Sequence, residues 1–253
     1  METSLEQNPN DVKLWLSLAR FHMKNHGKEQ EDVNNISGDK PLEKALSVLS
    51  KSLEANHDSE DLWIEYLTLF AKNSTAEDLR ELSYQAVMYA ATYNVWWTCL
   101  HLETDVQGKQ EICTEMIKFV IDSDEDVDFK SHALLETLFY LCKLLQCRGL
   151  TKLAFHCLSA ALGKSSVDDT NEKITIGDFR TFLKNKDLAL LWVCFLSFKC
   201  HNYLPENLHV AGESGPNRLV NKSKFLIDWK KPLLVTEKEV RTLYQGELYY
   251  YTV

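Results

Sequence analysis

Alternating acidic side chains are the first feature of this sequence that could do chemistry. The run 122–128 carries three of them at alternate positions, Asp122, Asp124 and Asp126. Carboxylates with this spacing open the calcium-binding loop of an EF-hand, but such a loop needs Gly at position 6 and Glu at position 12. Those positions hold Val127 and Ala133. The run therefore predicts a solvated loop between helices, with phosphorylation of Ser123 or contact with a basic partner segment left as alternatives.

Cysteine and histidine are the other residue types that could bind metal or act as nucleophiles. The chain has seven Cys and eight His. The closest Cys pairs, Cys142 with Cys147 and Cys194 with Cys200, are five and six positions apart, wider than the short knuckles that set two zinc ligands on one turn. None of the motifs G-x-S-x-G, G-x-x-x-x-G-K or H-E-x-x-H occurs. We therefore expect reduced, packed thiols, no metal, no cofactor, no catalytic residue and no enzymatic activity.

Basic residues alternate with aromatic ones near the C-terminus, a pattern typical of single-strand nucleic-acid binding. The segment 218–231 contains Arg218, Lys222, Lys224, Phe225, Trp229, Lys230 and Lys231. The whole chain has a formal charge of −9, so phosphate backbones are repelled by its overall field. We therefore expect no direct contact with nucleic acid, and direct RNA binding through 218–231 remains the alternative function.

The C-terminal residues predict an extended segment after the last helix. Helical periodicity fades after Pro205, and Thr236 with Glu239 predicts the cap of one short final helix. Three consecutive tyrosines, Tyr249, Tyr250 and Tyr251, are prone to aggregate if left uncovered. We therefore predict a repeat domain over 1–204 and a segment over 205–253 that docks on the repeats, on a second copy or on a partner.

Helices must position all of these residues. With 45% hydrophobic residues and only 9 Gly and 5 Pro in 253 residues, the chain can form a core but lacks the turn residues that sheets require. Apolar residues recur every three or four positions. This spacing predicts nine helices, over 12–25, 40–56, 61–72, 74–90, 94–103, 111–122, 132–149, 151–163 and 186–200.

A tryptophan signature recurs in these helices. A branched apolar residue, Trp, two further positions and then an apolar residue occur four times, around Trp15, Trp63, Trp96 and Trp192. Positions i and i+3 share a helix face, so Trp63 and Tyr66 are expected to form a wedge between stacked helix pairs. The pattern predicts an all-α fold, a right-handed solenoid of about four to five helix pairs. Trp97 is expected at an exposed edge, as an interface anchor.

At these residues the chain resembles the tetratricopeptide and half-a-tetratricopeptide repeat families. NPNDVKLWLSLARFH resembles a tetratricopeptide first helix, and DLWIEYLTLF resembles the half-repeat form. The resemblance covers about 8–162 and 186–204, and it departs where 26–40 is long and where Trp97 doubles the signature Trp. The order of the segments is also similar to the C-terminal repeat region of large nuclear CCCH-type zinc-finger scaffolds that connect poly(A)-tailed RNA to the exosome.

The second resemblance implies an excised domain, a nuclear location and a scaffolding role in RNA surveillance, with protein partners from an RNA-decay complex. The residues alone indicate a cytosolic or nuclear protein without a membrane span. We expect function through protein binding, with a homodimer as one possibility. The candidate partner-binding residues are Trp97, Phe225, Trp229, Tyr249, Tyr250 and Tyr251.

Overall fold

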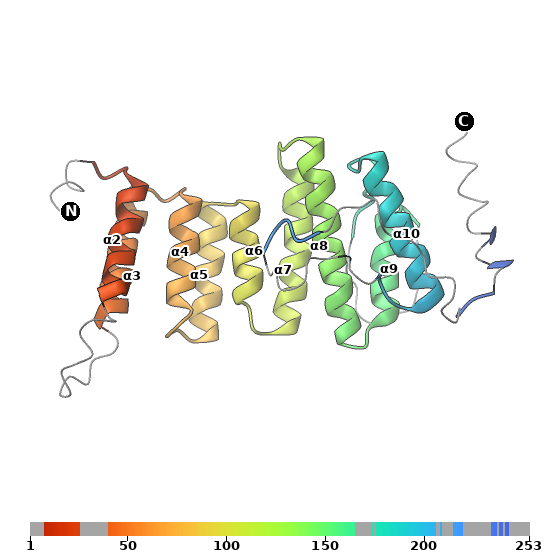
Figure 1. The fold of residues 1–253 in the computed structure, drawn as a ribbon, viewed down its shortest axis with the longest axis horizontal. Helices are drawn as coiled ribbons and strands as arrows, with labels where there is room; N and C mark the ends of the chain where they lie inside the picture. The colour runs from red at the N-terminus through yellow and green to blue at the C-terminus, as the bar shows by residue number, and fades with distance from the viewer. Residues whose placement is uncertain are drawn as a thin grey trace. The chain divides into compact units, whose positions relative to one another are not determined.

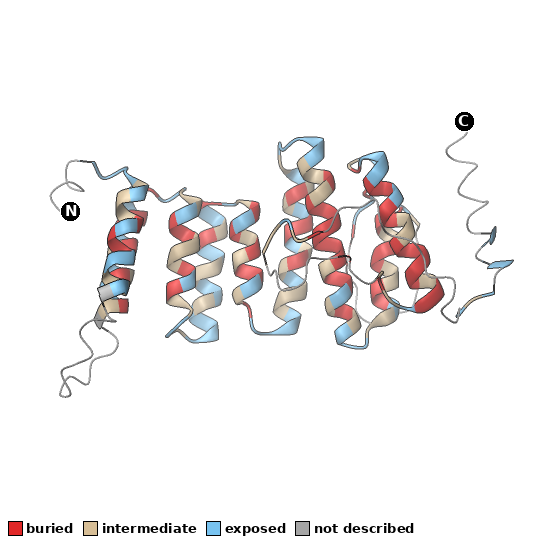
Figure 2. Ribbon diagram, viewed as in Figure 1, coloured by how far each residue is buried: buried red, intermediate tan, exposed pale blue. Residues whose placement is uncertain are grey.

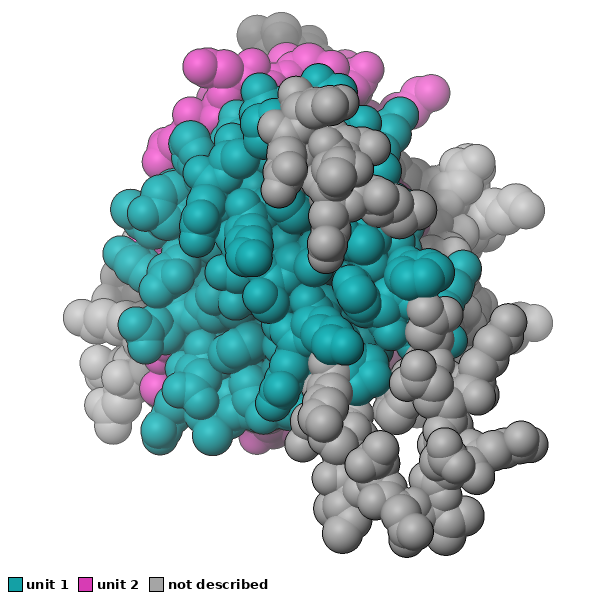
Figure 3. All heavy atoms as spheres, turned by 90° about the vertical axis from the view of Figure 1, so that its left-hand side faces the viewer, with its two compact units in different colours: residues 1–105 teal, residues 106–253 magenta. Residues whose placement is uncertain are grey.

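The chain folds into two compact groups of helices. The computed structural model describes residues 8–25, 40–164, 174, 176–205, 208, 215–219, 234–236, 238–239 and 241–242. Within these ranges all regular elements are helices, and nine are formed (Figure 1). The all-α prediction is therefore confirmed, while the handedness of the stack stays a prediction. Contacts divide the chain into unit 1, residues 1–105, and unit 2, residues 106–253 (Figure 3).

Unit 1 contains five helices, each next to its neighbour in sequence. They are α2 (Val12–Asn25), α3 (Lys40–Ala55), α4 (Glu60–Phe70), α5 (Ala76–Tyr89) and α6 (Tyr93–Leu102). Helix α3 packs on both α2 and α4, and α6 packs on both α4 and α5. Each helix turns an apolar stripe inward, which is why the buried residues in Figure 2 follow one face.

Short polar side chains begin several of these helices. Asp11 Oδ1 accepts a hydrogen bond from the Leu14 amide at 3.1 Å, and Thr92 caps α6 in the same way. Ser74 and Glu77 have the spacing of a capping box and predict Ser74 as the cap of the helix over 74–90, which is wrong by one residue. Thr75 is the cap of α5, because its hydroxyl accepts from the Asp78 amide at 3.2 Å, which fixes the first turn one position later.

The core of unit 1 contains Trp63, as the tryptophan signature predicted, while its place as a wedge between stacked helix pairs stays a prediction. Trp63 is 5% exposed and belongs to the buried cluster, while Trp15 and Tyr66 pack against that cluster only partly buried. The Trp63 and Tyr66 ring centroids are 6.3 Å apart, so the two rings meet on one face of α4 as the i, i+3 spacing predicted. The indole nitrogen of Trp63 donates to the His57 carbonyl at 2.7 Å.

Unit 2 contains four further helices with a more continuous core. They are α7 (Val106–Asp122), α8 (Val127–Cys147), α9 (Thr151–Ala161) and α10 (Asn185–His201). Helix α8 packs on both α7 and α9, and α10 packs on α9 and α8. Asp126 begins α8, because its carboxylate accepts from the Phe129 amide at 2.7 Å. One carboxylate of the acidic run thus acts as a helix cap.

The start of α10 is tied to α8 by polar contacts inside the core. The Ser131 hydroxyl donates to the Asp187 carboxylate and accepts from the Lys184 amide at 3.0 Å. Ser131 and Asp187 are both buried, so each needs the other as a partner. At the far end of α10, Asn202 takes a left-handed conformation with φ of 58°, which ends the helix.

None of the helices among the described residues is long and apolar enough to cross a membrane.

Candidate interaction surfaces

Trp97 does not lie at an exposed edge, and that expectation is wrong. The side chain is 2% exposed, and its ring meets Tyr93 edge to face with centroids 6.1 Å apart. Tyr93 and Trp97 are four residues apart and therefore share one face of α6. Trp96, which was expected in the core, is the partly exposed member of the pair. A role for Trp97 in partner binding stays a prediction, and its burial weighs against it.

The other predicted partner-binding residues lie outside the described residues: Phe225, Trp229, Tyr249, Tyr250 and Tyr251. Of the predicted basic and aromatic segment, Arg218 is described. Its guanidinium carbon lies 5.5 Å from the centroid of the Tyr140 ring on α8, a cation–π arrangement. This cation is therefore held within unit 2, and RNA binding by the segment stays a prediction.

The buried thiols have the properties expected of packing residues. Burial raises the pKa of Cys99 to about 11 and that of Cys157 to about 12. It also raises the pKa values of Cys142 and Cys194 well above the ordinary range. These four thiols are protonated at neutral pH and hence are weak nucleophiles and poor metal ligands. Within the described part of the chain, no three potential ligands converge as a metal site would require.

An aromatic and apolar patch covers the outer side of α5. The α5 patch consists of Tyr84, Met88 and Tyr89, which are 69%, 66% and 58% exposed. Tyr89 stacks on Trp63 with centroids 6.2 Å apart and planes inclined by 6°. Tyr89 therefore joins the patch to the buried core of unit 1. Exposed side chains of this size on a fixed support are typical of protein-binding surfaces.

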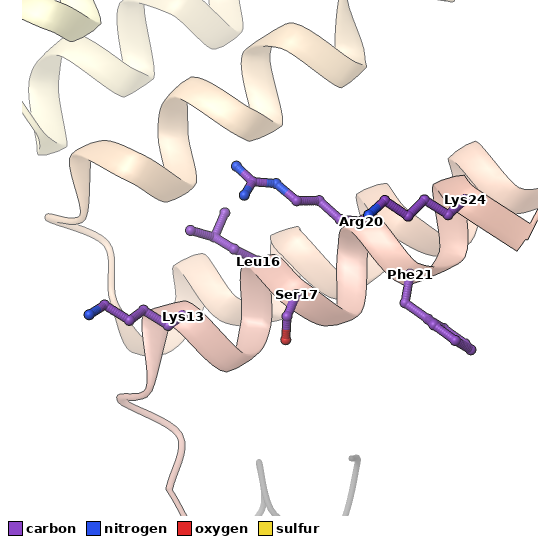
Figure 4. A pocket seen from close by; sticks show the side chains of 6 residues that line it. All are labelled: Lys13, Leu16, Ser17, Arg20, Phe21 and Lys24. Carbon is purple, nitrogen blue, oxygen red and sulfur yellow. The ribbon is translucent and has the colours of Figure 1, made fainter.

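A shallow groove of ≈ 380 Å³ lies along one face of α2. The α2 groove is lined by Lys13, Leu16, Ser17, Arg20, Phe21 and Lys24. Figure 4 shows Lys13 and Lys24 at its two ends, with Ser17 and Phe21 on one side and Leu16 and Arg20 on the other. Phe21 is 50% exposed, whereas Leu16 is buried in the core of unit 1, so the groove combines one accessible aromatic ring with basic side chains.

Arg20 is fixed in this groove by α4. Its Nε and Nη2 both donate to Glu65 Oε2, at 3.2 Å and 2.7 Å. These hydrogen bonds, together with the charge of Glu65, raise the pKa of Arg20 above its ordinary value. Arg20 is therefore an ordered cation that takes part in the surface without moving.

A second ion pair fixes the loop after α6 to α5. Arg80 donates to both oxygens of Glu103, at 2.7 Å and 3.0 Å. Glu103 Oε1 also accepts the backbone amides of Thr104 and Asp105, each at 2.8 Å. The hydrogen bond from Arg80 and those from these amides hold the pKa of Glu103 below its ordinary value. The N-terminal half of α5 is thereby joined to the loop after α6.

In unit 2, a buried carboxylate captures part of the C-terminal segment. Glu136 on α8 is 0% exposed. Its oxygens accept the consecutive backbone amides of Asn217, Arg218 and Leu219 at 2.9, 2.5 and 3.0 Å. His132 lies one turn earlier, with Nε2 3.6 Å from Glu136 Oε2. Consecutive backbone amides form a nest that binds anions, so this carboxylate, the Glu136 clamp, holds 217–219 against α8.

Sequence reasoning missed the Glu136 clamp and the α2 groove. The clamp left one signal, a single Glu inside the apolar run 132–149, because a charge there is buried only when it is paired. The groove left another signal, since α2 contains three basic residues and no acidic one. The α5 patch left the weakest signal, because Tyr84 and Tyr89 fit equally well into a core.

Comparison with known proteins identifies a family of related sequences. A sequence profile described as "NRDE-2, necessary for RNA interference" matches residues 1–182. The human zinc finger C3H1 domain-containing protein is 32% identical over 233 residues, which are 91% of this chain and 11% of that protein. The nuclear exosome regulator NRDE2 of Dictyostelium discoideum is 41% identical over 68 residues, 27% of this chain and 5% of that protein. The chain thus spans a small share of either relative.

Proposed function

This chain belongs to the NRDE-2 family, and we propose that it is a protein-binding scaffold in the nuclear surveillance of polyadenylated RNA. Two comparisons support the proposal. One relative is named as a nuclear exosome regulator, and the other as a zinc finger C3H1 protein. The zinc finger C3H1 protein agrees with the resemblance to CCCH-type scaffolds that the order of the helical segments indicated. A nuclear location follows from the same relatives.

The observation that carries the binding role is the α5 patch. Its three large side chains are exposed, and one of them, Tyr89, stacks on the buried ring of Trp63. Exposed aromatic side chains do not stabilise the folded chain, whereas a partner that covers them gains binding free energy because their apolar surface is removed from water. Stacked helix pairs also present such surfaces without needing a catalytic centre. The tetratricopeptide character of the repeats is part of this proposal.

A cellular experiment tests the pathway. Deleting the segment that encodes this chain from its gene should raise the abundance of nuclear polyadenylated RNAs that the exosome normally degrades, as measured by sequencing nuclear poly(A)-selected RNA. Reintroducing the intact coding segment should restore the original level. RNA levels that stay unchanged after the deletion would contradict the proposed role.

A matched pair of variants separates the binding surface from the fold. Tyr84→Ser with Met88→Ser should reproduce the effect of the deletion, because it removes the exposed apolar area. Lys44→Glu with Lys51→Glu alters an exposed face of α3 and should leave RNA levels unchanged. Equal effects from the two pairs would show that the α5 patch is not the surface that matters.

A further inference from the structure

The charge of α2 differs from that of the rest of the chain. The chain carries 37 acidic and 28 basic residues, yet α2 contains Lys13, Arg20 and Lys24 without any Asp or Glu. All three cations border the α2 groove. Arg20 is paired with Glu65, so the excess positive charge of the groove comes from Lys13 and Lys24. Such a local charge on an acidic protein favours encounters with anionic partners.

The length of the groove suits a short helix. Lys13 and Lys24 are separated by eleven residues, which corresponds to about 16 Å or three helical turns. Phe21 stands half exposed on one side, while Leu16 on the other side is buried in the core of unit 1 (Figure 4). A helix lying along α2 could therefore place two acidic residues at the ends and apolar residues between them.

Arg20 supplies a fixed point in the middle of the groove. Its bonds to Glu65 use Nε and Nη2, so Nη1 takes part in neither of them. The side chain remains 59% exposed and is held before any partner arrives. A cation ordered in advance costs less conformational entropy on binding than a mobile lysine.

From this arrangement we propose that the α2 groove binds an acidic amphipathic helix of a partner protein. The inference deepens the proposed scaffold function, on which it rests for its biological setting, but the binding itself can be measured without that setting. Nucleic acid fits less well. Two lysines and one paired arginine neutralise few phosphates, and a single half-exposed Phe offers little stacking area.

Fluorescence anisotropy with the full chain tests the proposal. The probe is a labelled helix-forming peptide of about 16 residues with two Glu about eleven positions apart and Leu between them on the same face. We expect binding with Kd of about 10–100 μM. Lys13→Glu with Lys24→Glu should raise Kd about tenfold, and Phe21→Ser should raise it about threefold.

Control variants and probes make the result decisive. Lys44→Glu with Lys51→Glu makes the same charge change on α3 and should leave Kd unchanged. A peptide with Lys in place of both Glu should bind the Lys13→Glu, Lys24→Glu variant better than the wild type. The proposal would be overturned if the acidic peptide did not bind at concentrations up to about 1 mM. It would also be overturned if the α2 and α3 charge-reversal variants lost the same affinity, or if a single-stranded RNA bound more tightly than the acidic peptide. None of these results depends on the cellular RNA experiment.

Discussion

Helices α5 and α8 show how differently the two units use their surfaces. In α5, Ala86 is the one fully buried residue, and three large apolar side chains face solvent. In α8, eleven residues are buried, among them Ser131, Glu136 and Thr137. A helix buried nearly all round is a core element, whereas a helix with exposed aromatics is free to contact a partner.

The contrast indicates that the two units have different roles. Unit 2 covers α8 with α7, α9 and α10 and captures 217–219 through the Glu136 clamp. Unit 1 leaves both the α5 patch and the α2 groove open among its described residues. We therefore expect unit 1 to supply the binding surfaces and unit 2 to be the more stable core, and four variants test this difference.

Trp63→Ala should have the largest effect. It removes the buried ring on which Tyr89 stacks, so unit 1 should lose about 3–5 kcal/mol of unfolding free energy. Hydrogen exchange should accelerate throughout α3 to α6 while the slowest amides of α8 keep their protection. An equal acceleration of hydrogen exchange in α8 would mean that the two units unfold together. That result would contradict the proposed difference in stability between them.

Glu136→Gln should destabilise unit 2 by about 2–3 kcal/mol, since the three amides lose a charged acceptor. Exchange at 217–219 should accelerate more than exchange in α9. Glu125→Gln, in the exposed loop before α8, is the matched control and should be neutral. Unchanged protection at 217–219 in the Glu136 variant would show that the clamp does not hold this segment.

Glu103→Gln should destabilise unit 1 by about 1–2 kcal/mol at pH 7. Because folding lowers the pKa of Glu103, the carboxylate stabilises the fold above its ordinary pKa of about 4.5. That contribution is lost as the pH falls through the lowered pKa of the folded state. Chemical denaturation of both proteins between about pH 7 and pH 3 should therefore show the difference shrinking at the acid end.

The exposed Glu77 provides a control for this titration. Glu77→Gln lies on the same helix as Arg80 and should change stability little at any pH. A difference between wild type and the Glu103 variant that stays constant across the titration would contradict the ion-pair account.

Tyr84→Ser with Met88→Ser should have the smallest effect on folding. Both side chains are largely exposed, so the free energy of unfolding should change by less than about 0.5 kcal/mol. Thermal denaturation followed by circular dichroism measures this directly. A loss above about 2 kcal/mol would place both side chains in a packed interior and remove the α5 patch as a binding surface.

Most helix positions followed from the sequence because apolar periodicity is a local property, but α7 and α8 begin at Val106 and Val127, five residues before the predicted starts at 111 and 132. Trp63 and Tyr66 were placed correctly by their i, i+3 spacing, and the Thr236–Glu239 cap forms with both partners bonded as predicted. The start of α5 was misplaced by one residue, since Ser74 and Thr75 are both good caps and backbone geometry selects between them.

Features that depend on distant contacts could not be placed in this way. Which of Trp96 and Trp97 is buried depends on what packs against each face of α6, and periodicity gives no answer for adjacent residues. The Glu136 clamp joins residues more than 80 positions apart. Its signal, a lone Glu in an apolar helix, indicates that a partner is needed without indicating which one.

The most direct test of the account is quantitative capture of exosome subunits from nuclear extract by the full chain and two double variants. The account predicts that wild type retains these subunits, that Tyr84→Ser with Met88→Ser loses most of them, and that Lys44→Glu with Lys51→Glu retains them at the wild-type level. Equal retention by all three proteins, or no exosome subunits retained by wild type, would contradict it.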